Sequence, residues 1–140
     1  MANGVMLGKA KVVRPGQDVV FVSSGLMTMR GLLAAEELGK RGVDVCVVHV
    51  PTIKPFDADT VVSQVDTDRM VFTLENHTIV GGLYESVASA LIQRGIGRKV
   101  RAIGLPDAFL DAGALNTLHD RYGLSKQAVV DRVLAELHAH

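Results

Sequence analysis

A carboxylate, an amide and an imidazole follow one another at Glu75, Asn76 and His77, directly after an apolar run. A carboxylate close to an imidazole can hold it in one tautomer or raise its pKa, which is the usual preparation for acid–base catalysis. If the chain is still extended there, Glu75 and His77 point to the same side. The structural alternative is that these side chains bond to neighbouring loop backbone, and that the pair Gly81-Gly82 lets a following helix approach the sheet closely. On the residues alone, the structural alternative is the commoner one.

A second polar segment, Ser23-Ser24-Gly25, connects a predicted strand to a predicted helix. Backbone N–H groups at the amino terminus of a helix can hold an anion. However, neither Gly-x-Gly-x-x-Gly nor Gly-Lys-Ser/Thr occurs in the chain, so the dinucleotide and phosphate-loop patterns are missing. We therefore expect an ordinary strand-to-helix turn at Ser24. Lys54, which precedes Pro55, could place a cation at the same edge of the sheet or could be a solvated loop lysine.

Metal binding and hydrolysis find little support in the sequence. The single cysteine, Cys46, allows neither a cysteine cluster nor an internal disulfide, and we expect it to be a buried thiol in a reduced protein. No His-Glu-x-x-His spacing occurs, and no Gly-x-Ser-x-Gly turn presents a serine nucleophile. The histidines are His49, His77, His119, His138 and His140. We expect no metal site, and we expect His49, inside an apolar strand, to be packed and hydrogen-bonded.

The composition indicates one globular domain. The chain has 140 residues, of which 48% are hydrophobic, and its 15 Lys and Arg residues balance 15 Asp and Glu residues. This balance provides no electrostatic surface for nucleic acid or an anionic membrane. No apolar stretch approaches the ~20 residues that span a bilayer, and no signal peptide is evident, so we expect a cytoplasmic protein.

Strand-like and helix-like segments alternate along the chain. Continuous β-branched runs at 18–24, 43–50, 69–75 and 99–105 predict strands that are buried on both faces. Helices are expected over 26–42, 57–65, 82–95 and 125–140, with a shorter one at 114–122. Their expected buried residues are Leu26, Met29, Leu33 and Leu38 in the first, Val61, Val62 and Val65 in the second, Leu83, Val87, Ala90 and Leu91 in the third, and Val129, Val130, Val133, Leu134 and Leu137 in the last. Asp57 and Ser125 are expected to be N-caps, while Gly42 and Gly95 end helices.

This alternation predicts a three-layer α/β/α fold with a doubly wound, mostly parallel sheet of about five strands. Turn residues at 14–17 predict that residues 9–13 add an antiparallel edge strand. Residues 1–17 would form a connector and this edge strand, and residues 18–140 a single globular domain. Ligands favour the carboxyl ends of the strands in such sheets, where the segments 23–25, 51–57, 75–82 and 104–113 should gather.

The order of these segments resembles the C-terminal domain of transketolase-like, thiamine-diphosphate-dependent enzymes. "TIKPFD" and "ENH" followed by "GGL" are the most specific parts, and "GLPDAFLDAG" and "YGLS" follow in the same order. The pattern resembles that of the short split transketolases in particular, and the C-terminal domains of deoxyxylulose-5-phosphate synthases and of 2-oxo-acid dehydrogenase β subunits are similar. Two positions depart from the pattern: Tyr84 stands where a third glycine is frequent, and Ala112-Gly113 where many synthases have His-Gly.

The resemblance implies a supporting role within a larger enzyme. Thiamine diphosphate and Mg²⁺ would be held in the full enzyme by a Gly-Asp-Gly…Asn motif of a first domain, and the activating glutamate would come from a second, pyrimidine-binding domain. Neither domain is expected within these 140 residues, and the early start of the connector suggests a fragment. The chain alone is therefore expected to bind no cofactor and to be inactive.

Its implied partners are a second copy in a homodimer and the missing N-terminal and pyrimidine-binding domains. Glu75 and His77 are the supporting candidates near the mouth of a substrate channel. Further candidates for a substrate or interface loop are Ser24, Lys54, Asn76, Gly81, Gly82 and Asp107. The alternatives are the corresponding part of a 2-oxo-acid dehydrogenase β subunit or of a deoxyxylulose-5-phosphate synthase, a module that senses an anion or nucleotide at the carboxyl edge, and a homodimeric module without a ligand.

Overall fold

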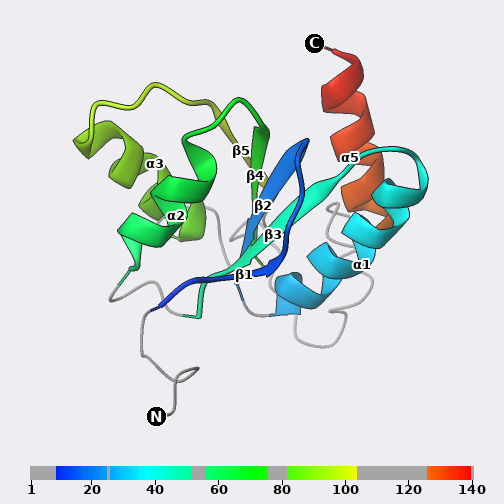
Figure 1. Ribbon diagram of the computed structural model, residues 1–140, viewed down its shortest axis with the longest axis horizontal. Coiled ribbons are helices and arrows are strands. Elements are labelled where there is room, and N and C mark those ends of the chain that lie inside the picture. The colour runs from blue at the N-terminus through cyan, green and yellow to red at the C-terminus, as the bar shows by residue number, and fades with distance from the viewer. Residues whose placement is uncertain (1–8, 25, 52–55, 76–81, 104–125, 140) are drawn as a thin grey trace, which may run out of the picture.

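The computed structural model describes residues 9–24, 26–51, 56–75, 82–103 and 126–139, and these residues form a three-layer α/β/α domain (Figure 1). The sheet has the order β1-β3-β2-β4-β5, with β1 antiparallel to β3 and all other neighbours parallel. Its strands are β1 (Lys11–Arg14), β2 (Val19–Ser23), β3 (Val45–His49), β4 (Met70–Leu74) and β5 (Val100–Ile103). The predicted fold class is confirmed, including the antiparallel edge strand.

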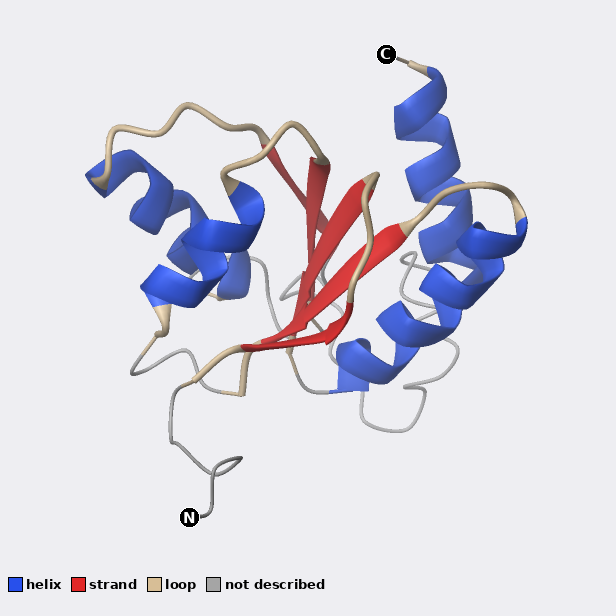
Figure 2. Cartoon of the chain, viewed as in Figure 1, coloured by secondary structure: helices blue, strands red, loops and turns tan. Residues whose placement is uncertain are grey.

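Four helices lie in the described part of the chain: α1 (Leu26–Lys40), α2 (Ala58–Val65), α3 (Leu83–Gln93) and α5 (Lys126–His138). Helices α1 and α5 cover one face of the sheet, and α2 and α3 cover the other (Figure 2). No helix of the described segments is long and apolar enough to cross a membrane.

Alternation along the strands divides the core into two layers. In β2, Val19 and Phe21 pack on the side of α1 and α5, whereas Val20 and Val22 pack on the side of α2 and α3. Phe21 meets Phe72 of the neighbouring strand edge-to-face, with ring centroids 6.0 Å apart. Both faces of the central strands are therefore buried, as their unbroken apolar sequence predicts.

The predicted buried face of α1 is partly wrong. Leu38 is buried, but Met29 and Leu33 are 59% and 46% exposed, and the side chain of Leu26 lies outside the description. The helix instead turns Met27, Ala34 and Ala35 to the sheet. The reason is close packing: at Gly31, between these residues, an added Cβ would already touch the side chains of Phe21 and Leu74. The face that approaches the sheet therefore combines the small residues Gly31, Ala34 and Ala35 with Met27 and Leu38 at its ends.

The other predicted core residues are confirmed where the structure describes them. The core residues expected in α2 and α3 are buried, and in α5 Val129, Val130 and Val133 are buried while Leu134 and Leu137 pack against them. Gly42 and Gly95 follow α1 and α3 with φ angles of 85° and 70°, as expected for residues that end helices. Ser125 and the expected short helix at 114–122 lie outside the described residues.

Candidate functional site

The candidate site is the edge of the sheet at which the parallel strands end. Ser23, His49 and Leu74 are the last residues of β2, β3 and β4, and Ile103 is the last residue of β5. Because β1 runs antiparallel to β3, the chain also enters its first strand at this edge, through Ala10. This carboxyl edge is where ligands bind in doubly wound sheets.

Glu75, the first residue after β4, is only 2% exposed, and its carboxylate accepts hydrogen bonds from the start of α3. Its Oε1 accepts from the backbone N–H of Leu83 at 2.7 Å and from that of Tyr84 at 3.4 Å. These are groups that a helix leaves without internal partners, and they lie at the positive end of its dipole. Glu75 therefore caps α3 from outside the helix, where a serine or aspartate N-cap would otherwise act.

Gly82, directly before α3, makes room for this carboxylate. A Cβ at residue 82 would lie 2.5 Å from Oε1 and 2.7 Å from Oε2 of Glu75, far inside van der Waals contact. The φ angle of Gly82 is −100°, which other residues adopt freely, so the requirement here is space and not backbone conformation. Gly82 thus lets the helix approach the strand end closely, as the structural alternative predicted for the glycine pair.

This arrangement decides which chemistry the amino end of α3 can support. With a carboxylate bound to its first N–H groups, the helix terminus already holds an anion of the protein itself. A second anion at the same N–H groups would meet a negative charge. The other candidates of this turn, Asn76, His77 and Gly81, lie outside the described residues, so their geometry relative to Glu75 stays a prediction.

A chain of polar side chains crosses from β2 to β3 through α1. The Oγ of Ser23, which is fully buried, lies 2.9 Å from Oγ1 of Thr28 and 3.3 Å from the carbonyl oxygen of Val48. Thr28 Oγ1 lies in turn 2.7 Å from Nδ1 of His49. The prediction that His49 is hydrogen-bonded is confirmed, although its ring is only partly buried.

Ser24 joins this edge through its backbone. Its N–H donates to the carbonyl of Leu74, and its own carbonyl accepts from Met27 in the first turn of α1. The residue is 8% exposed, and its hydroxyl makes no hydrogen bond with the described residues. Ser24 therefore belongs to the strand-to-helix turn that the sequence predicts.

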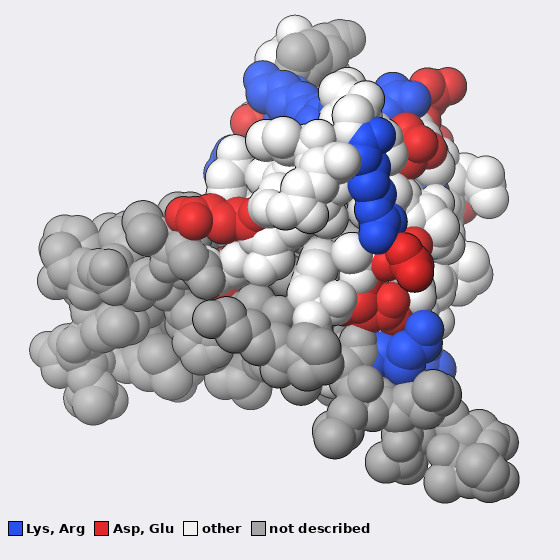
Figure 3. Space-filling model, turned by 90° about the vertical axis from the view of Figure 1, so that its left-hand side faces the viewer, with Lys and Arg blue, Asp and Glu red and all other residues white. Residues whose placement is uncertain are grey.

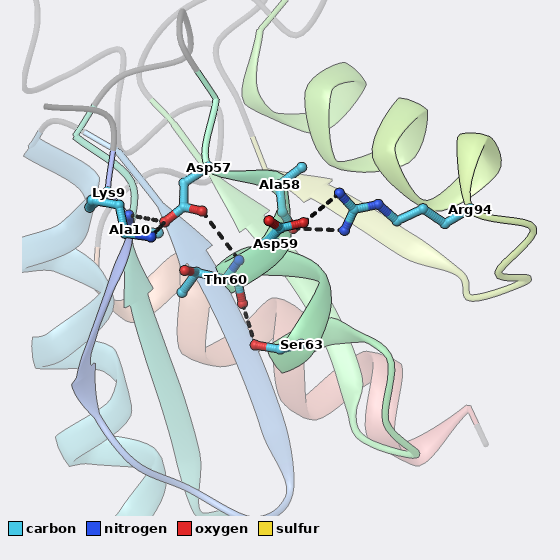
Figure 4. A network of polar contacts seen from close by, with 8 residues as sticks. All are labelled: Lys9, Ala10, Asp57, Ala58, Asp59, Thr60, Ser63 and Arg94. Carbon is cyan, nitrogen blue, oxygen red and sulfur yellow. Dashed lines mark hydrogen bonds and ion pairs between the residues drawn. The ribbon is translucent and has the colours of Figure 1, made fainter.

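Asp57 links the start of β1 to the start of α2 at the same edge (Figure 4). Its Oδ2 accepts from the N–H of Ala10 at 2.8 Å and lies 3.6 Å from Nζ of Lys9, while Oδ1 accepts from the N–H of Thr60 at 3.3 Å. Burial alone would raise the pKa of Asp57, but the hydrogen bonds from Thr60 and Ala10 and the charge of Lys9 outweigh it and hold the pKa below its ordinary value. The predicted N-cap is confirmed.

The sequence did not indicate that the same carboxylate holds the start of β1. Forty-seven residues separate Asp57 from Ala10, and a backbone donor leaves no mark in a sequence. On α2, Asp59 lies 2.8 Å from the guanidinium of Arg94 at the end of α3, so the two helices are also joined across their exposed side.

The surface on the side of α2 and α3 carries both signs of charge interspersed (Figure 3). No group of three or more metal-ligating side chains gathers among the described residues. The remaining candidates, Lys54 and Asp107, lie outside them.

Comparison with known proteins assigns the chain to a family. Residues 8–129 match the family model of the transketolase C-terminal domain. The chain belongs to this family, and the resemblance seen in the sequence is confirmed.

Among its relatives are a transketolase family protein of Sinorhizobium fredii, 54% identical over 91% of this chain and 37% of that protein, and the 6-deoxy-6-sulfo-D-fructose transketolase subunit SqwH of a Clostridium species, 36% identical over 89% of this chain and 38% of that protein. Deoxyxylulose-5-phosphate synthases are similar as well. A solved split-gene transketolase, an inactive β4 tetramer, matches with a TM-score of 0.83 and 31% identity over 94% of this chain and 43% of that chain. The chain thus spans about two fifths of the length of the two transketolase relatives and of the solved chain, and about one fifth of the length of the synthase.

Proposed function

We propose that this chain is the C-terminal domain of a transketolase-type, thiamine-diphosphate-dependent ketol transferase and is not catalytic alone. It would support dimerisation and contribute the turn that begins at Glu75 to the mouth of a substrate channel. The observation that carries the proposal is coverage: the family model spans residues 8–129, while proteins of similar sequence extend well beyond the matched part. The match to a split-gene transketolase supports an enzyme assembled from separate chains.

The amino end of α3 does not fit the diphosphate of such a cofactor. A diphosphate needs a helix amino terminus, a cation or a metal with carboxylate ligands. The amino end of α3 already binds the carboxylate of Glu75, which would repel a diphosphate. We therefore assign the cofactor and its Mg²⁺ to another part of the assembly, and we give this chain's residues no step in the cofactor's chemistry.

The place at which the chain enters β1 bears on where the preceding domain would lie. The contact of Ala10 with Asp57 fixes the start of β1 beside the carboxyl edge. A preceding domain, joined through residues 1–17, would then lie next to this edge of the sheet, on the side of β1. Under this proposal Glu75 acts as a positioning residue, because its carboxylate is committed to α3.

Activity of separated and combined chains tests the proposal. We expect the purified chain to show no ketol transfer and no calorimetric heat with thiamine diphosphate and Mg²⁺. Co-expression with a chain that carries the Gly-Asp-Gly…Asn motif and the pyrimidine-binding domain should yield a complex with turnover. Turnover by the 140-residue chain alone would refute the proposal.

A second candidate is the corresponding part of a deoxyxylulose-5-phosphate synthase, favoured by the 31% identity to the enzyme of Dictyoglomus turgidum over 95% of this chain. The same reconstituted complex decides between the two. A transketolase transfers a ketol group between sugar phosphates, whereas the synthase would form deoxyxylulose 5-phosphate.

A further inference from the structure

The hydrogen-bond contacts of Ser23, Thr28 and His49 determine which atom donates the hydrogen in each contact. A carbonyl oxygen cannot donate, so in the contact between Ser23 Oγ and the carbonyl of Val48 the serine hydroxyl is the donor. A serine hydroxyl has a single hydrogen. The contact between Ser23 and Thr28 must therefore use the hydrogen of Thr28.

The assignment of hydrogens extends from Thr28 to His49. Once the hydroxyl hydrogen of Thr28 points to Ser23, Thr28 Oγ1 can only accept at its 2.7 Å contact with Nδ1 of His49. Nδ1 must then carry the hydrogen. If every donor and acceptor were exchanged, the lone pairs of Ser23 Oγ and of the Val48 carbonyl oxygen would face each other without a hydrogen between them. Ser23 is fully buried, so this arrangement would be costly. A single direction of the chain satisfies all three contacts.

We propose that this chain of hydroxyls holds His49 in the Nδ1–H tautomer, so that Nε2 of the neutral ring keeps a bare lone pair at the carboxyl edge of the sheet. His49 is partly exposed, while the anchoring Ser23 is buried. The contact with Thr28 therefore holds the ring at Nδ1, and His49 keeps partial exposure among the described residues. His49 becomes a placed hydrogen-bond acceptor, a role that nothing in its sequence position among apolar residues indicates.

The neighbouring strand limits what Nε2 can bind. Lys11 of β1 lies directly opposite His49 in the antiparallel pair, and opposite side chains share a face about 5 Å apart at Cβ. The ammonium of Lys11 disfavours a cationic donor at this position. The group that fits is a neutral donor, a hydroxyl or an amide N–H. That a substrate or a partner domain supplies it depends on the proposed function, whereas the tautomer depends on this chain alone.

Nitrogen-15 NMR of the full chain tests the tautomer. Long-range proton–nitrogen correlations, recorded above about pH 8 so that an ordinary histidine is neutral, distinguish a protonated from a bare ring nitrogen. We expect a protonated Nδ1 and a bare Nε2 for His49, with His49→Asn identifying the signals. His138, exposed at the end of α5, serves as the internal comparison, and we expect the usual mixture of tautomers there.

Two substitutions of Thr28 complete the test. Thr28→Ser keeps the hydroxyl and should preserve the Nδ1–H tautomer of His49. Thr28→Val removes the hydroxyl at nearly constant volume and should shift the ring toward the Nε2–H tautomer. A protonated Nε2 in the unmodified chain, or the same tautomer in both variants, would overturn the proposal. Since no partner and no activity are needed, such a failure would leave the proposed function untouched.

Discussion

At the scale of single residues, Glu75 shows how position decides the role of a reactive side chain. A carboxylate in a sequence near an imidazole suggests acid–base chemistry, but here one oxygen accepts two backbone N–H groups at the positive end of α3. The carboxylate, the helix start and Gly82 form one unit, because the carboxylate occupies the space that a side chain at residue 82 would need. Each member of this unit can be changed separately.

Gly82→Ala should destabilise the domain by about 1–3 kcal/mol, because the new methyl group would displace the buried carboxylate. Urea unfolding measures the loss. Gly97→Ala is the matched control: apart from the adjoining residues of the chain, no described atom lies within 4 Å of a Cβ at residue 97, so the free energy of unfolding should stay within about 0.5 kcal/mol. Equal effects of the two substitutions would contradict a spatial requirement at Gly82.

Glu75→Gln should be milder than Glu75→Ala. The amide oxygen of glutamine can still accept from the N–H of Leu83, although the charge is lost and an NH₂ group replaces the second carboxylate oxygen. Alanine leaves the N–H groups of Leu83 and Tyr84 without this acceptor in a buried position, which costs about 1–3 kcal/mol. Denaturant unfolding of the two variants side by side gives the comparison. If glutamine proved as damaging as alanine, the charge and not the hydrogen bonds would carry the effect.

At the scale of secondary-structure elements, Asp57 ties the start of β1 to the start of α2 through one buried carboxylate. The tie depends on the ionised form, since both oxygens accept hydrogen bonds and Lys9 is close. Its pKa lies below the ordinary value of 3.8 because these contacts outweigh burial. A lowered pKa in the folded state means that the stabilisation is complete well above the ordinary value of 3.8 and is lost as the pH falls past this value and through the folded-state pKa.

Asp57→Asn should therefore remove part of the acid sensitivity of the domain. At neutral pH the variant should be less stable than the unmodified chain, and the difference should shrink between about pH 5 and pH 2. Thermal unfolding across this range measures both curves. Glu36→Gln, at an exposed carboxylate of α1 that has no ion pair among the described residues, should leave the difference between neutral and acidic pH unchanged. A constant gap between the Asp57→Asn and unmodified curves would show that the carboxylate contributes nothing through its ionisation.

Helix α5 is fastened to β5 by a charged pair that the apolar pattern does not reveal. Arg101, 9% exposed in the middle of β5, lies with Nε 2.8 Å from Oε1 of Glu136. Hydrogen bonds from Arg101 and then from Arg132 hold the pKa of Glu136 below its ordinary value. We expect Glu136→Gln to lower the Tm and to speed hydrogen exchange at Val129–Val133, because Arg101 loses this carboxylate in a buried setting. Glu36→Gln, at an exposed position on α1, should change neither quantity.

Most elements of this fold could be predicted from the sequence because their signals are local. Unbroken β-branched runs, Asp57 before α2 and the glycines that end α1 and α3 each act on their immediate neighbours. The buried face of α1 could not, because it depends on how closely the helix approaches the sheet at Gly31. For the same reason the sequence indicated Glu75 and Gly82 as candidates but not their contact, which exists only once β4 and α3 meet.

At the scale of the whole molecule, the two edges of the sheet matter for any association between copies. The pairing of β1 with β3 is irregular between Val12 and Arg14, and charged side chains flank the exposed Val13. At the other edge, the guanidinium of Arg132 lies 3.4 Å from the carbonyl oxygen of Ala102 in β5. Irregular pairing and charged residues are the usual means by which proteins prevent strands from joining edge to edge. The proposed homodimer should therefore form through other surfaces.

Val13→Lys tests this expectation. The substitution adds a third positive charge to the exposed edge formed by Lys11 and Arg14, so it should abolish any association in which β1 pairs with a second copy. Because β1 is already unsuited to such pairing, we expect the mass measured by light scattering to stay above the 15.0 kDa of one chain in both proteins. The free energy of unfolding should also change by less than about 0.5 kcal/mol, since Val13 is exposed. A fall to the monomer mass in the variant alone would place the interface at β1, and the partner domain would then have to approach the carboxyl edge from the side of β5.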